Sequence, residues 1–325
     1  MREVVDALRG AQRITAIGHE NPDADTLGAA LAIRTVGERL GIPAEVVLAD
    51  PVPGYLQFLP GVESVRTVPS FEPDVAVIVD CGDLARIGSL ASEHADWLAA
   101  SRIVNIDHHV SNPGFGAVNH VDAEAASTCE MVALLLPDLG VELDADLATV
   151  LLAGIVNDTR TFAHPNVTPR TLRVAATLVE AGADLALINR KIYAEKSNAT
   201  IAVWGLMLAG VGTAAGGRII HAAMTEAMLA QTGARREASE GFIDLLSLSR
   251  EADIVLLFKE HGPATTRVSI RTSDIADAVA IAAKFGGGGH ARAAGCTVDA
   301  PLAEARDQVL TESERELARA DDRRH

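Results

Sequence analysis

Residues 14–27 read ITAIGHENPDADTL and combine three kinds of sequence in one short stretch. The β-branched run at 14–17 predicts a buried strand. The turn that follows carries His19, Asp23 and Asp25, all of them side chains that bind metal ions. The apolar residues from Leu27 onward predict a helix that ends near Gly41. A strand, a polar turn and a helix in this order form the repeating unit of an open α/β sheet.

Three later positions repeat this arrangement of an apolar run followed by an acid or an imidazole. Asp80 closes the run 75–79, Asp107-His108-His109 closes 103–106, and Asp158 follows the apolar stretch 151–156. The carboxyl ends of neighbouring strands share one crevice in an open α/β sheet. We therefore expect residues this far apart in the chain to meet there.

The eight side chains would bring five carboxylates and three imidazoles into one crevice, where they would repel one another unless cations lay among them. Oxygen and imidazole ligands without thiolate suit Mn, Mg, Fe or Zn. The pattern predicts a two-metal site and a metal-dependent hydrolase. For residues 19–25 taken alone, an Asx-rich surface turn with a helix cap is the alternative, and the other clusters weigh against it.

The fold class predicted is α/β, with a mostly parallel sheet of five or six strands in an N-terminal domain and a second, smaller α/β domain across a cleft. Strands are expected at 14–18, 45–49, 74–79 and 102–106, and helices at 27–40, 127–135, 145–157, 169–181 and 184–194. We place the metal-dependent domain at residues 1–190, a connecting helix and linker at 191–214, and a substrate-binding domain at 215–325. In the last, strands are expected at 218–222, 254–258, 267–271 and 294–298, helices at 225–231, 239–247, 275–284 and 302–317, and a frayed end from 319 to 325.

The chain carries 28 basic and 44 acidic residues, a net charge of −16. Long nucleic acid is bound through lysine and arginine that replace the counterions of its phosphates, so this excess of acid disfavours a protein that coats long nucleic acid. Cys81, Cys129 and Cys296 lie far apart and are odd in number, which fits a reducing compartment. No apolar secretory core opens the sequence, and no apolar run is long enough for a membrane span. We expect a cytoplasmic protein that acts on small anionic ligands.

These motifs, in this order, resemble the DHH phosphoesterase family, named for the triplet present here at 107–109. The family's first motif is present as HENPDADTLG at 19–28 and its fourth as GIVNDT at 154–159. The block GGGGH at 286–290 with AAG at 293–295 resembles the signature of the DHH-associated C-terminal domain. In length and layout the chain is most similar to the NrnA-type enzymes, which act on very short oligonucleotides and on 3′-phosphoadenosine-5′-phosphate. Ala24 and Ala29 depart from the usual glycine and serine, but neither change removes a metal ligand.

The resemblance implies which residues hold which ion. His19 and Asp23 would bind the first ion, Asp25, His108 and Asp158 the second, and Asp80 would bridge the two. It also implies two divalent ions, with Mn expected and Mg, Fe or Co as alternatives, and a homodimer.

His108 and His109 directly follow a predicted strand, so we expect their side chains to point to opposite faces and only one to be a ligand. We choose His108 as the ligand. His109 would then reach the substrate phosphate or the leaving group as a catalytic residue. Asp107 would support it by fixing an imidazole in place.

Two further places are candidates for substrate binding. Ser127 and Thr128 begin a predicted helix whose first N–H groups could hold a phosphate, although simple helix capping explains the pair equally well. The run that includes Gly287, Gly288 and Gly289, followed by His290, exceeds what a helix stop needs and lets backbone N–H groups approach an oxyanion. Arg271, at the end of a predicted strand, is the candidate for a second phosphate.

The activity expected is metal-dependent hydrolysis of phosphoester bonds in di- to short oligoribonucleotides and in 3′-phosphoadenosine-5′-phosphate, with release of nucleoside monophosphate. A phosphodiesterase for cyclic di-AMP or a linear dinucleotide is the first alternative, and a non-catalytic nucleotide-binding regulator is the second. The GGGGH block argues against an inorganic pyrophosphatase of the same family. The lack of a basic nucleic-acid domain argues against a RecJ-type exonuclease.

Overall fold

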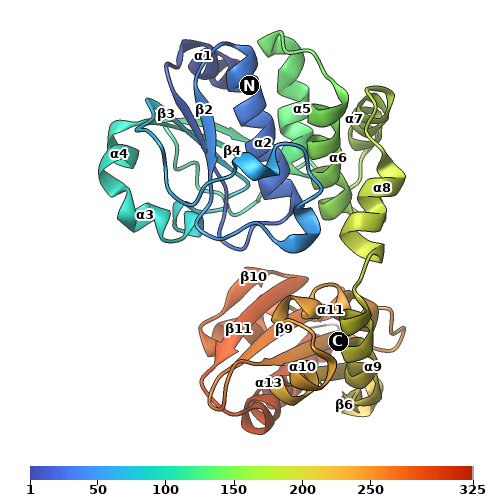
Figure 1. The fold of residues 1–325 in the computed structure, drawn as a ribbon. Helices are drawn as coiled ribbons and strands as arrows, with labels where there is room; N and C mark the ends of the chain where they lie inside the picture. The colour runs from blue at the N-terminus through green and yellow to red at the C-terminus, as the bar shows by residue number, and fades with distance from the viewer. Residues whose placement is uncertain (324–325) are drawn as a thin grey trace. The chain divides into compact units, whose positions relative to one another are not determined.

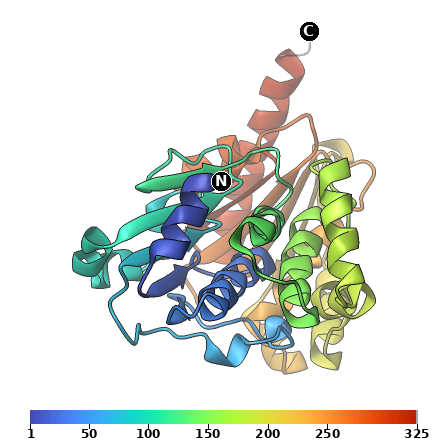
Figure 2. The same cartoon turned by 90° about the horizontal axis from the view of Figure 1, so that it is seen from above.

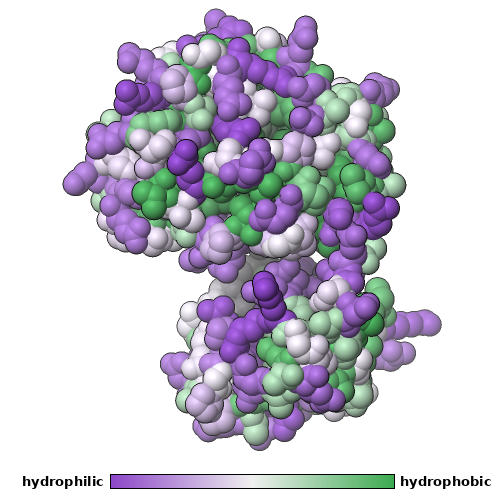
Figure 3. All heavy atoms as spheres, in the orientation of Figure 1, coloured by the Kyte–Doolittle hydropathy of each residue, from purple (hydrophilic) through white to green (hydrophobic). Residues whose placement is uncertain are grey.

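The computed structural model describes residues 1–323, with the side chains of all of these except His290. The chain divides into two compact units, Met1–Glu195 and Lys196–His325, each with a sheet of its own (Figure 1). Hydrophilic residues are spread over the drawn face of each unit, between smaller apolar areas (Figure 3). Within residues 1–323, no helix is both long and apolar enough to cross a membrane.

The first unit contains a five-stranded sheet in the order β2-β1-β3-β4-β5, in which every pair of neighbours is parallel. Its strands are β1 (Ile14–Ile17), β2 (Ala44–Val47), β3 (Val75–Val79), β4 (Arg102–Asp107) and β5 (Val118–Val121). The predicted parallel α/β class is therefore confirmed. Because all strands run the same way, the residues that follow β1, β3 and β4 come to one edge of the sheet.

Helices cover both faces of this sheet. They are α1 (Arg2–Gly10), α2 (Ala24–Arg39), α3 (Leu90–Glu93), α4 (Ala95–Ala100), α5 (Thr128–Leu139), α6 (Ala145–Thr159), α7 (Pro169–Glu180) and α8 (Leu185–Asn189), with short turns η1 (Gly54–Leu56), η2 (Val62–Ser64), η3 (Leu84–Ile87) and the π-helical η4 (Arg190–Ala194). Along β3, Val77 and Val79 belong to the larger core under α2, α5 and α6, whereas Ala76 and Ile78 face the smaller core with Trp97 of α4. Helices α2, α5, α6 and α7 pack side by side (Figure 2).

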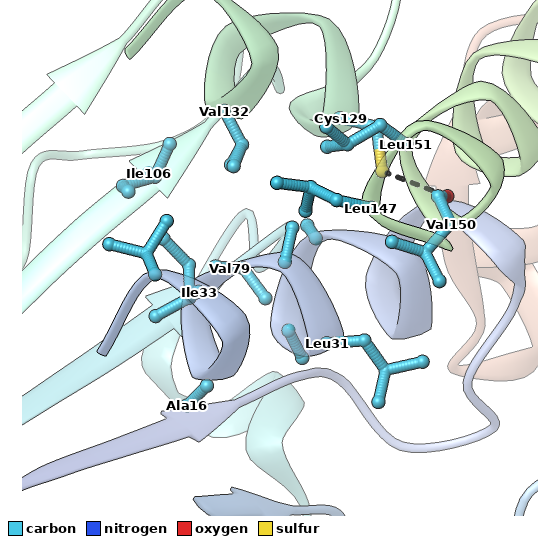
Figure 4. Close-up of a cluster of buried hydrophobic side chains, with 14 of the residues drawn as sticks. Ala16, Leu31, Ile33, Val79, Ile106, Cys129, Val132, Leu147, Val150 and Leu151 are labelled. Carbon is cyan, nitrogen blue, oxygen red and sulfur yellow. Dashed lines mark hydrogen bonds between the residues drawn. The ribbon is translucent and has the colours of Figure 1, made fainter. Parts of the chain in front are cut away.

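The larger core joins α2, α5 and α6 to the sheet (Figure 4). Leu31 and Ile33 of α2 are buried there with Leu147 and Leu151 of α6. The two helices approach so closely at Gly28 that a Cβ atom there would lie 2.4 Å from the carbonyl oxygen of Val150. This contact fixes how far α6 can stand from α2, and so it also fixes where the end of α6 lies.

The second unit has a mixed six-stranded sheet in the order β10-β11-β9-β8-β7-β6, parallel only between β7 and β8. Its strands are β6 (Gly212–Ala214), β7 (Ile219–Met224), β8 (Ile254–Glu260), β9 (Thr266–Thr272), β10 (Gly288–His290) and β11 (Ala293–Val298). Its helices are α9 (Asn198–Ala209), α10 (Glu226–Thr232), α11 (Phe242–Leu246), α12 (Ala278–Ala282) and α13 (Leu302–Asp322), with turns η5 (Ala215–Gly217), η6 (Arg236–Ser239) and η7 (Ala283–Phe285). The core under α12 and α13 lies on one face of the sheet, and the core with α9, α10 and α11 lies on the other.

Several elements differ from the sequence expectations. Helix α9 was expected within a connector, but Val203 and Met207 bury it in the core of the second unit. Helix α13 was expected to fray from residue 319, but it continues to Asp322, where Arg319 and Arg323 pair with the buried Glu316. The sequence analysis did not predict three strands, β5, β6 and β10, because they are only three or four residues long and rich in glycine or polar residues. It also did not predict helix α1.

Candidate metal centre

The carboxyl edge of the first sheet gathers the predicted acids and imidazoles from five elements. His19 follows β1, Asp80 follows β3 and His108 follows β4. Asp23 and Asp25 lie at the first turn of α2, and Asp158 lies in the last turn of α6. The structure therefore places side by side residues that the chain separates by as many as 139 positions, from 19 to 158.

Asp80 lies at the centre of this group and is 3% exposed. One of its oxygens is 3.6 Å from His19 Nε2, and the other is 3.5 Å from His108 Nε2. Hydroxyl groups hold the same carboxylate, with Thr26 donating at 2.7 Å and Thr128 at 3.2 Å. A carboxylate that presents one oxygen to each side of the site has the geometry of a bridge.

Two sets of three candidate ligands adjoin each other: Asp80 belongs to the first set and lies 3.5 Å from His108 of the second. His19, Asp23 and Asp80 have ligand atoms within 4.8 Å of one another, and so do Asp25, His108 and Asp158. A third group, Asp80, His108 and His109, meets the same limit. Imidazole nitrogens and carboxylate oxygens in these numbers fit divalent ions of the Mn type.

Two thiols lie next to the site but do not join the ligand set. Cys81 Sγ contacts the carbonyl of Val79 at 3.3 Å, and Cys129 Sγ contacts that of Asp25 at 3.4 Å. Burial and nearby carboxylates hold the pKa of both thiols well above the usual range. Neither thiol belongs to any group of described residues whose ligand atoms lie close enough together to hold one ion.

Asp23 is positioned as the N-cap of α2. Its Oδ1 accepts from the N–H groups of Asp25 and Thr26, each at 3.0 Å. Its Oδ2 accepts from the Asn157 side chain at 3.3 Å, and Asn157 also donates to Asp158 Oδ1 at 3.1 Å. Asn157 thus links a candidate ligand of the first set to one of the second.

Asp25 is fully buried against the first turn of α5. Its two oxygens accept from the N–H groups of Thr128 at 2.7 Å and Cys129 at 2.9 Å. Ser127 is the N-cap of α5 and accepts from Glu130 N at 3.1 Å. At this helix start, phosphate binding and simple capping were equally good explanations; in the structure Ser127 caps the helix and the first amides hold the Asp25 carboxylate. Ser127 and Thr128 are both fully buried. Their contact with substrate stays a prediction.

His108 and His109 were expected to point to opposite faces, but both side chains point to the same side, toward Asp80. Strand β4 ends at Asp107, so the alternation of a strand does not continue through the two histidines. Their rings lie edge to face with centroids 4.8 Å apart, and His109 Nδ1 is 3.8 Å from Asp80. Asp107 holds His109 by a contact of 2.6 Å to Nδ1 and accepts from Asn112 at 2.6 Å through its other oxygen.

The electrostatics of the metal-free site follow from burial and from this mixture of charges. Burial lowers the pKa of the His108 imidazole, but Asp158 and Asp80 raise it by more, to about 12. His19 is affected in the same way by Asp80 and Asp23, and its pKa is raised to about 9. Burial and the charges of Asp80 and Asp158 raise the pKa of Asp23 to about 6. Burial would raise the pKa of Asp80 too, but His108 and His19 lower it well below its usual range.

Backbone strain is concentrated around the same residues. Asn21, Asp80, Arg160, Thr161 and Phe162 all have positive φ between 47° and 64°, a region that residues other than glycine rarely adopt. Such conformations cost roughly 1–3 kcal/mol each and persist only where the surroundings enforce them. Asn21 lies two residues from His19 and Asp23, and Asp80 is itself a candidate ligand. The other three directly follow the end of α6.

Sequence reasoning missed the residues that support the ligands. Asn157, Thr26 and Asn112 hold ligand or neighbouring carboxylates, and the Tyr193 hydroxyl lies 2.9 Å from the carbonyl of Asn157. Nδ1 of His164 lies 3.1 Å from the carbonyl oxygen of Asp158. Asn157 and Thr26 had a local signal, as the neighbours of Asp158 and Asp25.

In the second unit the glycine block forms a hairpin edge. Strand β10 pairs with β11, and a Cβ atom on Gly289 would lie 2.5 Å from the carbonyl oxygen of Ala293, while its φ is +141°. Close strand pairing therefore requires this glycine, and Gly288 beside it is exposed with open space around its Cα. Arg271 lies opposite Ala293 across β9 and β11, with Nε 3.8 Å from Asp244. The side chain of His290 lies outside the described part of the structure.

A parallel α/β sheet with two adjoining sets of candidate histidine and aspartate ligands at its carboxyl edge is typical of a metal-dependent phosphoesterase domain. The chain belongs to the DHH family: residues 13–155 match the DHH family N-terminal domain and residues 216–319 match the DHHA1 domain. A bifunctional oligoribonuclease and PAP phosphatase NrnA from Thermus thermophilus is 35% identical over 321 residues, covering 98% of this chain and 94% of the relative.

Two other relatives show where the likeness lies. A probable manganese-dependent inorganic pyrophosphatase from Exiguobacterium is 31% identical, but only over 53% of this chain and 56% of its own length. The crystal structure of an exopolyphosphatase-related protein from Bacteroides fragilis has a TM-score of 0.90 at 21% identity, covering 98% of this chain and 97% of that one. At this identity the structural likeness establishes the fold.

The contact between α6 and Asp25 gives a first prediction. A methyl group on Gly154 would lie 2.5 Å from Asp25 Oδ1 and 2.4 Å from Cys129 Sγ. Gly154→Ala should therefore displace Asp25, destabilise the chain by about 1–3 kcal/mol, and weaken Mn binding by about tenfold or more. Calorimetric Mn titration and thermal unfolding would measure both effects.

Gly205→Ala in α9 is the matched control, because nothing lies within 4 Å of the added methyl. It should bind Mn as the wild type does and unfold at the same or a slightly higher temperature. If Gly154→Ala keeps the wild-type number and affinity of bound ions, Asp25 is not a ligand in the arrangement described.

The raised imidazole pKa values give a second prediction. At pH 6–8, His19 and His108 are protonated in the metal-free chain, since their pKa values are about 9 and about 12. A metal ion requires the neutral imidazole, so binding must release protons and must weaken as pH falls, by about tenfold per pH unit for each proton released. Below about pH 6, protonation of Asp23 should steepen the loss. Titrations in buffers of different ionisation enthalpy count the protons, and an affinity that is flat from pH 6 to 8 would contradict this.

Proposed function

We propose that the chain is a two-metal phosphoesterase that hydrolyses phosphoester bonds in di- to short oligoribonucleotides and in 3′-phosphoadenosine-5′-phosphate, releasing nucleoside monophosphate. The observation that carries this proposal is the pair of ligand sets that meet at Asp80. Two ions a few ångströms apart are the arrangement used by enzymes that transfer phosphoryl groups to water.

His19 and Asp23 would hold one ion, Asp25, His108 and Asp158 the other, with Asp80 shared between them. When bound, the two ions would polarise the phosphate and lower the pKa of water so that hydroxide is available near neutral pH. Asn157, Thr26 and the first turn of α5 keep the carboxylates in place for this. Manganese is the expected ion, and a relative named as manganese-dependent supports the choice.

His109 is the residue assigned to the substrate. Burial lowers the pKa of its imidazole, but the hydrogen bond with Asp107 and the charge of Asp80 raise it by more. Asp107 contacts Nδ1 of this imidazole at 2.6 Å, and His109 would meet the substrate phosphate or give a proton to the leaving oxygen. Asp107 is the positioning residue in this pair.

The second unit would bind the part of the substrate that does not react. Arg271 offers a guanidinium for a phosphate, and the open backbone at Gly288 gives room for close approach. The Thermus thermophilus relative, named for oligoribonuclease and PAP phosphatase activity, aligns over nearly its full length and supports substrates of this size. Action as a homodimer in the cytoplasm stays a prediction.

The direct test of this function is a substrate panel with Mn after removal of metal by chelator. Diadenylate and 3′-phosphoadenosine-5′-phosphate should be hydrolysed. Oligomers of about ten or more nucleotides should be poor substrates, because a chain with a net charge of −16 offers few cationic contacts to a long phosphate backbone. Excess chelator should abolish all activity. Full activity in chelator after long dialysis, or a rate that rises with chain length, would contradict the proposal.

A fourth prediction separates substrate binding from chemistry. Arg271→Ala should reduce kcat/KM for 5′-phosphorylated diadenylate by about 10-fold to 1000-fold, since it removes a charge-assisted contact to the phosphate that does not react and the positioning it supplies. Hydrolysis of bis-p-nitrophenyl phosphate, which is too small to need this contact, should fall far less. Asp158→Ala should abolish both activities by removing a ligand. Equal losses on the two substrates in Arg271→Ala would contradict the assigned role.

A further inference from the structure

Two members of the second ligand set are held by one short part of the chain, residues 122–126 and the start of α5. The Nδ1 atom of His108 lies 3.3 Å from the carbonyl oxygen of Ala125. The first turn of α5, which follows directly, donates two N–H groups to Asp25. The position of residues 122–126 therefore bears on how both ligands stand.

Residues 122–126 have little of their own to hold them in place. Strand β5 ends at Val121 and α5 begins at Thr128, so they lie between two elements. Their sequence is DAEAA, and the buried members, Ala125 and Ala126, each contribute only a methyl group to packing. Buried backbone N–H and carbonyl groups need hydrogen-bond partners, and here the partners must come from other parts of the fold.

Glu130 of α5 is one of these partners. Its side chain is fully buried, and Oε2 accepts from the N–H of Ala126 at 3.0 Å and from the Thr171 hydroxyl at 2.9 Å. Its Oε1 accepts from Nε of Arg170 at 2.6 Å. A buried carboxylate is tolerated only where an opposite charge and hydrogen bonds compensate it, and the start of α7 supplies both.

Arg170 connects Glu130 to the other end of the same residues. Its Nη1 lies 2.9 Å from Asp122, while its Nε holds Glu130. A planar guanidinium can bond two carboxylates in fixed directions, which a single ammonium group cannot do. One side chain of α7 thus fixes residue 122 directly and residue 126 through Glu130.

Asn166, shortly before α7, extends this support toward the third ligand of the second set. Its amide donates to the carbonyl of Ala126 at 3.0 Å and, more weakly, to that of Asp158 at 3.4 Å. The first ligand set is held differently. Nδ1 of His19 lies 2.7 Å from the carbonyl oxygen of its neighbour in the chain, and Asp23 caps α2. The support from α7 therefore serves one side of the metal centre.

We propose that Glu130 and Arg170 are positioning residues for the ion held by Asp25, His108 and Asp158, and that they set its affinity independently of the other ion. They act through residues 122–126 and the first turn of α5. Loss of a group that orients a ligand typically weakens metal binding by about 10-fold to 100-fold. This inference rests on the proposed function, because it requires two bound ions.

The experiment titrates metal-free, full-length protein with Mn by calorimetry. Wild-type protein should bind two ions per chain. In Arg170→Met, one ion should bind with the wild-type affinity and the other about 10-fold to 100-fold more weakly. Arg170→Lys keeps the charge but cannot bridge two carboxylates in the same way, so it should recover only part of the loss. If Arg170→Met does not fold, Arg170→Lys carries the test.

Glu130→Gln tests the carboxylate at nearly constant shape. The amide nitrogen of a glutamine would face the N–H of Ala126 in one orientation and that of Arg170 in the other, so a donor meets a donor either way. This variant should weaken the same ion as Arg170→Met.

Two further measurements show that one particular ion is lost. At a Mn concentration between the two dissociation constants of the variant, electron paramagnetic resonance should show coupled pairs of ions in the wild type and mostly single ions in Arg170→Met. In crystals of the variant soaked with limiting Mn, the anomalous peak among Asp25, His108 and Asp158 should be the weaker one. A weaker peak in the first ligand set would overturn the proposal.

Glu45→Gln is the matched control, because Glu45 is a buried carboxylate of the same kind in the same unit. It is 5% exposed and accepts from the N–H of Ser70 at 3.1 Å and from its hydroxyl at 2.6 Å, with Arg66 3.8 Å away. It ties to β2 a loop that carries no candidate ligand. Glu45→Gln should lower the temperature of thermal unfolding, as Glu130→Gln does, and leave both Mn affinities unchanged.

The inference and the function on which it rests fail in different ways. Two wild-type affinities in Arg170→Met and Glu130→Gln, or equal weakening of both ions, would overturn the positioning role and leave the phosphoesterase function standing. If wild-type protein binds fewer than two Mn ions, the two-metal basis of the proposed function fails, and this inference fails with it.

Discussion

The negative charge around Asp80 is the constraint on which the rest of the first unit depends. Asp23, Asp25 and Asp158 stand around a buried carboxylate. Burial, together with the charges of Asp80 and Asp158, raises the pKa of both Asp23 and Asp25. In the metal-free chain, protons on His19 and His108 offset this charge, and hydrogen bonds from Thr26 and Thr128 hold the central carboxylate. Divalent ions would replace these protons as the positive charge beside the carboxylates, so metal binding would be coupled to the release of protons from His19 and His108.

The helices that pack on the sheet also hold these carboxylates in place. The first turn of α5 supplies two N–H groups to Asp25, and close packing of α6 on that residue at Gly154 leaves no room for a side chain. Asn157 ties the end of α6 to the start of α2, and the left-handed backbone at Asp80 turns its carboxylate into the centre. The strained backbone at Asp80 lowers the stability of the fold, and in return the carboxylates, which repel one another, keep fixed positions.

Much of this could be predicted from the sequence, because it follows from short-range patterns. Apolar runs that end in Asp80 or Asp107 mark buried strands and their carboxyl ends, and parallel order brings those ends together. What could not be predicted depends on contacts between elements. The amides of α5 face Asp25 only because α2 and α5 pack side by side, and the two histidines share one side only because β4 ends at Asp107.

The central claim is that two ions bind on either side of the Asp80 carboxylate. Crystals grown or soaked with Mn and measured above and below the Mn absorption edge test this directly, because the difference locates manganese alone. The account predicts two anomalous peaks per chain, one among His19, Asp23 and Asp80 and the other among Asp25, His108 and Asp158, with Asp80 between them. A single peak, or two peaks of which neither touches Asp80, would contradict it.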